Sequence, residues 1–530
     1  MWNQPYLPVG HSLALSAVCA SLPILVLLIS LGVLRLSAWK SGVIGLVTAI
    51  IVAAFVYGMP AKLVFSATAY GVAFGLLPIA WIVFWAVALY RLTVETGQFE
   101  IIKDSMGRLT QDRRLQALLI AFAFGAFIEG AAGFGTPVAV AAAMLTGLGF
   151  TPFYAAAICL VANTAPVAFG AIGTPLVTLA GVTNLPLATL SAEVGRICAP
   201  VSLFIPSYLM LVMGGPTALR TVWPAALVCG VCFAATQYLV SNHIGPYLTD
   251  ILASLATILG LVVLLKLWRP SDAAAMPVQV AIPTGVLLRA WSPYILLVIF
   301  VLLWGYTPFK ALLDKATIAF PWPGLDGEIQ RLPPVVRAAA PYAAKFNFNF
   351  LSASGTSAML ATLFAAIVLR VPAGKFFAVV ANTARSLALS ILTICAVLAL
   401  AYVMNYSGAT ATLGLAFAAT GVLFPFFSAI LGWLGVFLTG SDTSSNALFG
   451  NLQVVTADTL GLSPELMAAS NSSGGVMGKM ISLQSISVAA AATGMAAADE
   501  AKLFRFTLRH SIFLAIVIGL IVTLYAYVLY

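Results

Sequence analysis

Long apolar runs follow one another along almost the whole chain, and no other feature constrains its fold as strongly. Residues 12–34, 63–89 and 376–404 form three of them, and each exceeds the roughly 18 residues that mark a membrane-spanning helix. In hydrocarbon only helices and closed barrels satisfy every backbone donor and acceptor, and continuous runs exclude a barrel. The sequence therefore predicts an all-α polytopic membrane protein with about 12 to 14 transmembrane helices.

Composition also points to lipid as the main solvent. Hydrophobic residues make up 62% of the chain and charged residues only 8%, whereas about a quarter of the residues of soluble domains are charged. The mean hydropathy is +1.06. A net charge of +9 could suggest a nucleic-acid partner, but the bases lie in short loops beside the apolar runs. We therefore expect the partner to be the lipid bilayer and expect no nucleic acid.

The positions of the basic residues predict the orientation of the chain. They cluster at residues 35–40, 91–114, 266–289, 370–375 and 502–509, so we expect these loops in the cytoplasm and both termini outside. The first eleven residues lack the basic start of a signal peptide, so the first apolar run is expected to be a retained helix. The long polar interruption at residues 306–345 would then lie on the outer side.

Two stretches within the single transmembrane domain expected over residues 1–530 resemble each other. "GAFIEG" at residues 125–130 parallels "GVFLTG" at 435–440, and "GFTPFYAA" from Gly149 parallels "GLSPELMAA" from Gly461. We therefore predict an internal repeat, with copies at about residues 115–215 and 425–498, although loop charges leave open whether the copies are parallel or inverted. Paired interrupted segments of this kind indicate the substrate site of a transporter.

Glycine and proline occur in these copies where an uninterrupted helix would have large apolar residues. Glycine frees the backbone and proline removes a hydrogen-bond donor, so both interrupt helices. We predict broken or re-entrant helices at these positions, because irregular backbone at membrane depth survives only inside protein or beside a cavity. The expected helix-break residues are Gly130, Gly133, Gly135, Pro137, Pro166, Gly474 and Gly475.

Polar side chains accompany each expected break, and they can bind ions or ligand oxygens. Half-helix N-termini beside them would offer free N–H groups to a carboxylate. The alternative is that small residues simply allow close helix packing. The polar candidates are Asn163, Thr164, Ser444, Ser445, Asn446, Asn471, Ser472 and Ser473.

Few charged residues lie in these segments, which makes each of them informative. Glu129 precedes the first break, Asp442 lies in the matching part of the second copy, and Lys479 follows the last glycine-rich stretch. We expect Lys479 to meet a substrate carboxylate, and Glu129, with Asp442 as the next candidate, to carry a coupled proton. Poor solvation at membrane depth would favour a neutral carboxyl. Each could instead form an ion pair or reach the interface, and Glu193, Arg196 and Arg385 are weaker candidates.

At these residues the chain resembles the lactate permease family of bacterial plasma-membrane carriers. The resemblance rests on "EGAAGFGTPVAV" (129–140), "NTAPVAFGAIGTP" (163–175), "GSDTSSNALFGNLQ" (440–453) and "NSSGGVMGKMIS" (471–482). It covers essentially the whole chain and implies uptake of L-lactate, with D-lactate and glycolate, by proton symport across the plasma (inner) membrane. One departure is Leu483, where the family pattern leads us to expect proline.

The wider group of inverted-repeat anion carriers includes dicarboxylate transporters whose Asn-Thr motifs bind carboxylate and sodium. By that analogy Asn163, Thr164, Asn471, Ser472 and Ser473 become substrate-binding candidates. The alternative function is therefore a sodium-coupled carboxylate transporter of the same design. A proton-pumping subunit of an enzyme complex would need a longer chain of buried charged residues. No nucleophile, base and orienting group occur at a recognisable spacing, so we expect no enzyme, no catalytic residues, no metal and no cofactor.

Overall fold

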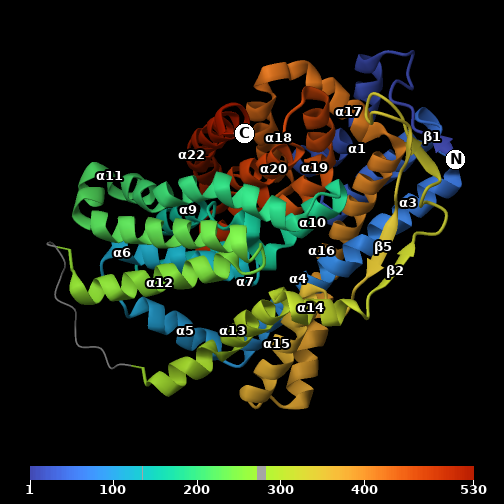
Figure 1. Cartoon of the computed structure of the whole chain (residues 1–530). Coiled ribbons are helices and arrows are strands. Elements are labelled where there is room, and N and C mark those ends of the chain that lie inside the picture. The colour runs from blue at the N-terminus through green and yellow to red at the C-terminus, as the bar shows by residue number, and fades with distance from the viewer. Residues whose placement is uncertain (134, 271–281, 530) are drawn as a thin grey trace.

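Almost every apolar run is helical in the computed structural model, which describes residues 1–133, 135–270 and 282–529 (Figure 1). Residue 134 of the first motif and residues 271–281 of the expected basic loop lie outside the described residues. The first part of the chain forms α1 (Leu13–Gly32), α2 (Ala38–Ile51), η1 (Val52–Val56), α3 (Ala61–Phe74), η2 (Gly75–Ala80), α4 (Trp81–Glu95) and α5 (Gln98–Gly107).

The segment expected to be the first repeat copy is made of short helices. These are α6 (Arg113–Gln116), η3 (Ala117–Phe124), α7 (Gly125–Ala131), α8 (Thr136–Gly147), α9 (Pro152–Ala162), η4 (Val167–Phe169) and α10 (Gly170–Thr183). Longer helices follow: α11 (Leu187–His243), α12 (Thr249–Leu267), α13 (Thr284–Gly305), α14 (Thr307–Asp314), α15 (Ser354–Val368) and α16 (Ala373–Ser407).

The last quarter of the chain packs against the first repeat segment. It comprises α17 (Ala409–Phe417), η5 (Ala418–Leu423), α18 (Phe424–Thr439), α19 (Asp442–Leu460), α20 (Pro464–Lys479), α21 (Leu483–Thr493), α22 (Ala497–Leu524) and η6 (Tyr525–Leu529). Helix α10 contacts α19, and α21 contacts α8 and α9. In Figure 1 these orange and red helices lie directly against the green ones.

The described residues contain eleven helices long and apolar enough to cross a membrane, and the bent pair Pro152–Ala162 and Val167–Thr183 brings the number to twelve if the pair is one span. Helix α11 has 57 residues and leaves helical geometry at Gly214 and Gly215, so each half is long enough for one crossing. Large apolar side chains such as Phe55, which is 82% exposed, point outward as lipid-facing residues do. The chain is a multi-pass membrane protein, as the sequence predicted.

The all-α prediction omitted five short strands. They are β1 (Trp2–Asn3), β2 (Ile318–Pro321), β3 (Ile329–Arg331), β4 (Ala340–Pro341) and β5 (Lys345–Phe348). Strand β3 pairs in parallel with β1 and antiparallel with β4, while β2 pairs antiparallel with β5. The polar segment 306–345 is thus folded and fastened to the N-terminus, which apolar periodicity could not reveal.

The strands and the basic loops mark two ends of the helix bundle. At the strand end, the Gln4 amide donates to the backbone oxygen of Asn405, 2.9 Å away, while the Asn405 amide donates to Val182 at the end of α10. At the basic end, Lys375 Nζ donates to the Glu95 carbonyl over 2.7 Å.

Candidate functional site

Four interruptions of the helices surround one cavity. They lie between α7 and α8, between α9 and α10, between α18 and α19, and between α20 and α21. Each leaves backbone groups without a helical partner, so each end needs a polar surrounding. The cavity is lined by residues from all four interruptions and from α16.

The first interruption follows Ala131. Gly133 and Gly135 have φ angles of +61° and +80°, which residues with a Cβ rarely adopt. Pro137 then lies in the first turn of α8, where a missing N–H does no harm. Gly130, expected to be part of the break, lies inside α7, and a Cβ there would come 2.7 Å from the Cβ of Asp250. Its role is close packing against α12.

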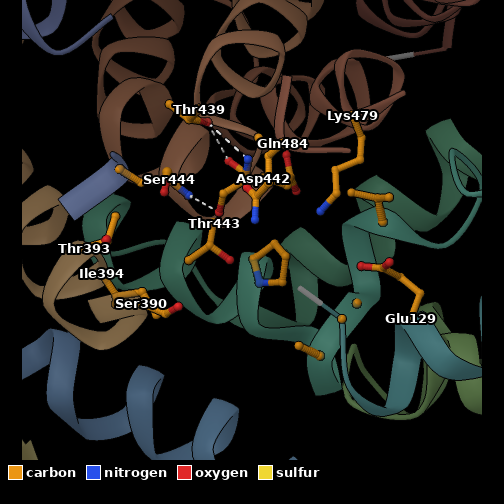
Figure 2. Close-up of a pocket in the computed structure, with 18 residues that line it drawn as sticks. Glu129, Ser390, Thr393, Ile394, Thr439, Asp442, Thr443, Ser444, Lys479 and Gln484 are labelled. Carbon is orange, nitrogen blue, oxygen red and sulfur yellow. Dashed lines mark hydrogen bonds between the residues drawn. The ribbon is translucent and has the colours of Figure 1, made fainter. Parts of the chain in front are cut away.

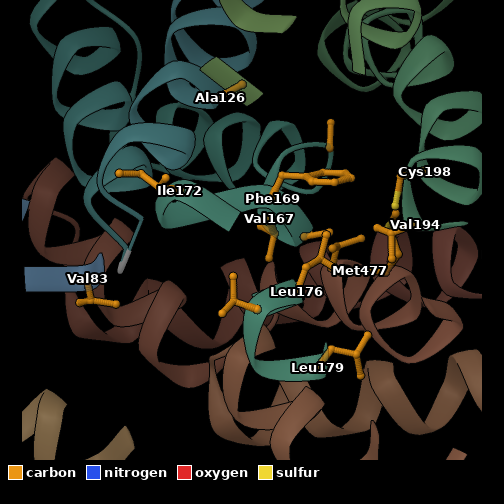
Figure 3. Close-up of a cluster of buried hydrophobic side chains, with 14 of the residues drawn as sticks. Val83, Ala126, Val167, Phe169, Ile172, Leu176, Leu179, Val194, Cys198 and Met477 are labelled. Atoms are coloured by element: carbon orange, nitrogen blue, oxygen red, sulfur yellow. The ribbon is translucent and has the colours of Figure 1, made fainter. Parts of the chain in front are cut away.

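The second interruption follows Asn163, with Pro166 just before η4. The two helices on either side meet at a bend of 67°. Ala171, Ile172 and Gly173 all have positive φ, so regular helix resumes only after them. Figure 3 shows how Phe169 and Ile172 pack among buried apolar side chains, with Cys198 of α11 and Met477 of α20 nearby. This packing holds an unusual backbone in place.

In the second copy the helices end elsewhere than expected. Helix α20 continues through Gly474 and Gly475 and ends only at Lys479, so these two glycines are not helix breaks. A Cβ on Gly474 would collide with the Ala429 carbonyl of α18, and one on Gly475 would collide with the Asp442 carboxyl. Glycine is required at both positions because α18 and α19 approach α20 closely. This agrees with the alternative interpretation, in which small residues allow close packing of helices.

The cavity has a volume of about 120 Å³ and is shown in Figure 2. This is several times the space that one water molecule needs. Its walls include Gly133, Gly170 and Ala171 from the first copy and the stretch 439–444, Lys479 and Gln484 from the second. Ser390, Thr393 and Ile394 of α16 and Ala38 of α2 complete the lining.

Three charged residues face this cavity. Lys479 extends from the end of α20 toward the space between Asp442 and Glu129 (Figure 2). It is 8% exposed, and among the described residues it has neither a hydrogen-bond partner nor a carboxylate within 4 Å. Glu129 accepts a hydrogen bond of 3.0 Å from the Asn163 amide. A buried ammonium group is therefore available to an anion that enters the cavity.

Hydrogen bonds from residues that do not line the cavity hold the carboxyl of Asp442 in place. Its Oδ2 accepts from Ser472 Oγ over 2.5 Å and from the Asn446 amide over 3.3 Å. The Asn471 amide donates to Asn446 Oδ1 over 2.9 Å, and the Gln453 amide donates to Asn471 Oδ1 over 3.1 Å. Asp442 Oδ1 has no partner among the described residues. Asn446, Asn471 and Ser472 thus form a layer behind Asp442 and do not line the cavity.

The remaining expected site residues are dispersed. Ser444 lines the cavity, whereas Thr164 donates to the Val161 carbonyl and Ser445 to the Gly432 carbonyl. The hydroxyl of Ser473 is buried without a partner in the described chain. Glu193 and Arg196 form a salt bridge of 2.9 Å at i, i+3, and Arg385 is exposed on α16.

Sequence reasoning missed several lining residues. Three of them are polar and lie next to helix breaks that the sequence predicted: Gln484, Thr443 and Thr439. Their closeness in sequence to these breaks could have identified them. Ser390 and Thr393 lie in the middle of α16, which reads as an ordinary apolar helix. Only the packing of α16 on the repeat segments brings them to the cavity.

Comparison with known proteins identifies the relatives of this chain. The family described as L-lactate permease matches residues 16–529. The glycolate permease GlcA of Escherichia coli (strain K12) is 48% identical, over 99% of this chain and 98% of that protein. The L-lactate permease of Bacillus subtilis (strain 168) is 45% identical, over 98% of this chain and 97% of its own length.

A solved structure shares the fold at low sequence identity. Neisseria gonorrhoeae MtrF, assigned to a class of antimetabolite efflux pumps, aligns with a TM-score of 0.50 at 15% identity, over 94% of this chain and 97% of that one. At this identity the likeness concerns the fold alone. Together, the match along nearly the whole sequence and the relatives above 40% identity show that the chain belongs to the L-lactate permease family, a family of membrane transporters and not of enzymes.

Proposed function

We propose that this protein imports small 2-hydroxy monocarboxylates, namely L-lactate, D-lactate and glycolate, together with a proton. The names of its relatives support lactate and glycolate as substrates. The observation that carries the proposal is the position of Lys479, a buried cation without a partner among the described residues, in a small cavity between two carboxyl groups.

The substrate carboxylate binds Lys479 in this proposal. A carboxylate stripped of water requires charge-assisted donors, each contributing about 1.5 to 3 kcal/mol. Besides Lys479, the hydroxyls of Thr443 and Ser444 and the amide of Gln484 line the same cavity. The N-termini of α19 and α21 add partial positive charge at Asp442 and Leu483. One cation suits a monocarboxylate better than a dicarboxylate, whose second charge would stay uncompensated.

The proton compensates for the negative charge of the site. With Glu129 and Asp442 both ionised, Lys479 leaves a net charge of about −1, and an entering anion would be repelled by several kcal/mol at short range. Asp442 has two donors on one oxygen, whereas Glu129 has one donor. Protonation of Glu129 therefore removes a negative charge without breaking the layer behind Asp442. Proton and anion then favour each other's binding.

We also infer that the two copies, at about 115–215 and 425–498, are an inverted duplication. Each contains two helix interruptions and a hairpin whose turn is capped alike: Thr151 Oγ accepts from Tyr154 N, and Ser463 Oγ accepts from Leu466 N. The first hairpin turn lies by Arg113, which donates to the Gly149 carbonyl at the basic end.

The second hairpin points the other way. Val455, late in the helix that leads to its turn, packs with Tyr6 and Leu332 at the strand end. Opposed hairpins that meet at a central cavity suit alternating access, in which each side opens in turn. The positive-inside rule would put the basic end in the cytoplasm and the N-terminus outside, in the bacterial plasma (inner) membrane.

Uptake into proteoliposomes tests the proposal. Purified protein should accumulate labelled L-lactate when the outside is acidified at constant sodium concentration, with glycolate competing and succinate not. A sodium gradient at constant pH should drive no accumulation. Accumulation that requires sodium would favour the sodium-coupled alternative, and effective succinate competition would contradict a site built for a single carboxylate.

A further inference from the structure

A second buried acid, Asp250, lies against the same broken helix as Glu129, and no sequence motif marked it. It is the second residue of α12 and is 1% exposed. Both of its carboxyl oxygens lack a hydrogen-bond partner among the described residues. Glu129 and Asp442 each accept at least one hydrogen bond. An ionised carboxylate without donors is unstable in a buried site, so Asp250 is held there as a neutral acid.

The position of Asp250 relates it to Glu129 through the adjacent residue. A Cβ on Gly130 would lie 2.7 Å from Asp250 Cβ and 3.1 Å from the backbone nitrogen of Ile251, so α7 and α12 touch at this glycine. The carboxyls of Asp250 and Glu129 interact electrostatically. Asp250 does not line the cavity, whereas Glu129 does. Asp250 therefore lies next to the residue that follows Glu129, outside the lining of the cavity.

Asp250 lies near the end of α12 that is opposite to the basic end of the bundle. The turn between α11 and α12 begins at His243 and Ile244, both exposed, and is only a few residues from Asp250. The other end of α12 carries Lys266, which belongs to the basic end of the bundle. The turn is therefore at the end opposite to the basic loops.

The titratable groups that face Asp250 come from two helices. Glu129 is on α7 and Cys198 is on α11, while η3, which also packs on α12, has no titratable residue. No described lysine or arginine forms a salt bridge with it. The charge of Glu129 is thus the main variable that Asp250 experiences. Neither Asp250 oxygen is hydrogen-bonded to Glu129 in this state, so a proton passes between them only when the helices move closer or a water molecule bridges the two carboxyls.

We propose that Asp250 loads Glu129 with the coupled proton, so that the proton comes from a residue outside the lining of the cavity that the substrate enters. The O–H of Asp250 transfers its proton to the Glu129 carboxylate, which leaves Asp250 ionised until it takes up another proton from the outer side. This assignment rests on the proposed proton symport. It explains why Gly130 is needed inside a helix, because any side chain would force α12 and its acid away from α7.

The test compares Asp250→Asn with wild type in liposomes. Two assays are run on each preparation: lactate accumulation driven by a pH gradient, and exchange of labelled for unlabelled lactate at equal pH. We expect the variant to lose at least tenfold in the initial rate of accumulation while exchange keeps its rate and its lactate affinity. Ser254→Ala, which removes another buried polar group from α12, is the matched control and should resemble wild type in both assays.

The outcomes separate this inference from the proposed function. If wild type itself fails to accumulate lactate on a pH gradient, the proposed symport is wrong. If wild type succeeds and Asp250→Asn does as well, only the role of Asp250 is overturned. A loss of both exchange and accumulation in a well-folded variant would also contradict it, because a loading group is not needed for exchange.

A second measurement does not depend on a variant that folds. Dicyclohexylcarbodiimide reacts with protonated carboxyl groups in apolar surroundings, so wild-type protein should be modified at Asp250, with accumulation lost in proportion. Peptide mass spectrometry identifies the modified residue. Full reaction elsewhere with Asp250 unmodified would overturn the proposal.

Discussion

The side-chain amide of Asn163 donates a hydrogen bond of 3.0 Å to the carboxylate of Glu129 and so joins two helix interruptions. Glu129 lies two residues before the end of α7, and Asn163 caps the end of α9 just before the second interruption. The other amide atom, Asn163 Oδ1, is buried without a partner in the described chain. The charge state of Glu129 therefore acts directly on the side chain that caps the helix before the second interruption.

Lys479→Ala should weaken lactate binding at least tenfold. The ammonium group lines the cavity and is its only described cation, and a charge-assisted bond contributes about 1.5 to 3 kcal/mol. Tenfold corresponds to about 1.4 kcal/mol. The half-saturation concentration of exchange measures this effect. Lys502→Ala, an exposed lysine that lies over the Phe153 ring, is the control and should leave it unchanged. An unaltered affinity in Lys479→Ala would remove this residue from the site.

Gln484→Leu should affect hydroxy acids more than acids without a hydroxyl group. The Gln484 amide lines the same cavity as Lys479, near Asp442, and can hydrogen-bond the 2-hydroxyl while Lys479 holds the carboxylate (Figure 2). We expect lactate affinity to fall about tenfold, since one hydrogen bond is lost and a polar group stays unpaired. Competition by propionate should change little. Equal losses of affinity for lactate and propionate would mean that Gln484 supports the shape of the cavity and does not bind the 2-hydroxyl group.

Gly474→Ala should destabilise the protein although it adds only a methyl group. The new Cβ would collide with the Ala429 carbonyl, where α20 and α18 are in close contact, and overpacking of this kind costs about 1 to 3 kcal/mol. Thermal unfolding in detergent should show a lower midpoint. Gly147→Ala at the end of α8 makes the same chemical change where nothing lies within 4 Å, so its midpoint should stay near that of wild type. Equal midpoints for the two variants would contradict the packing role.

Local sequence patterns predicted the membrane helices and the segments that interrupt them. Length and hydropathy identify a helix in lipid without any knowledge of its neighbours, and clustered glycine, proline and polar residues mark its ends. That is why Gly133, Gly135 and Lys479 could be singled out. The strands at residues 318–348 escaped prediction because their pairing partners include the distant N-terminus.

Tertiary packing decided the rest of the site. The sequence could not separate a glycine that breaks a helix from one that lets two helices touch, so Gly474 and Gly475 were misinterpreted. Asn471 and Ser472 were expected to touch the substrate, but a cavity wall of residues 439–444 stands in front of them. Asp250 drew no notice because a single acid near the start of an apolar helix looks like a residue at the membrane surface.

Glu129→Gln tests the central claim most directly, because it fixes the coupling residue in a neutral form. Glutamine can still accept the hydrogen bond from Asn163, so the local geometry is retained. Glu100→Gln, at an exposed acid paired with Lys103, is the matched control. Protein amount and orientation are equalised between the liposome preparations.

Accumulation on a pH gradient and lactate exchange are then measured side by side. The account predicts that Glu129→Gln exchanges lactate as wild type does but no longer accumulates it, because no proton can leave the site on the inside. Glu100→Gln should do both. If Glu129→Gln accumulates lactate to the wild-type level, Glu129 does not carry the coupled proton, and the coupling mechanism proposed here is wrong.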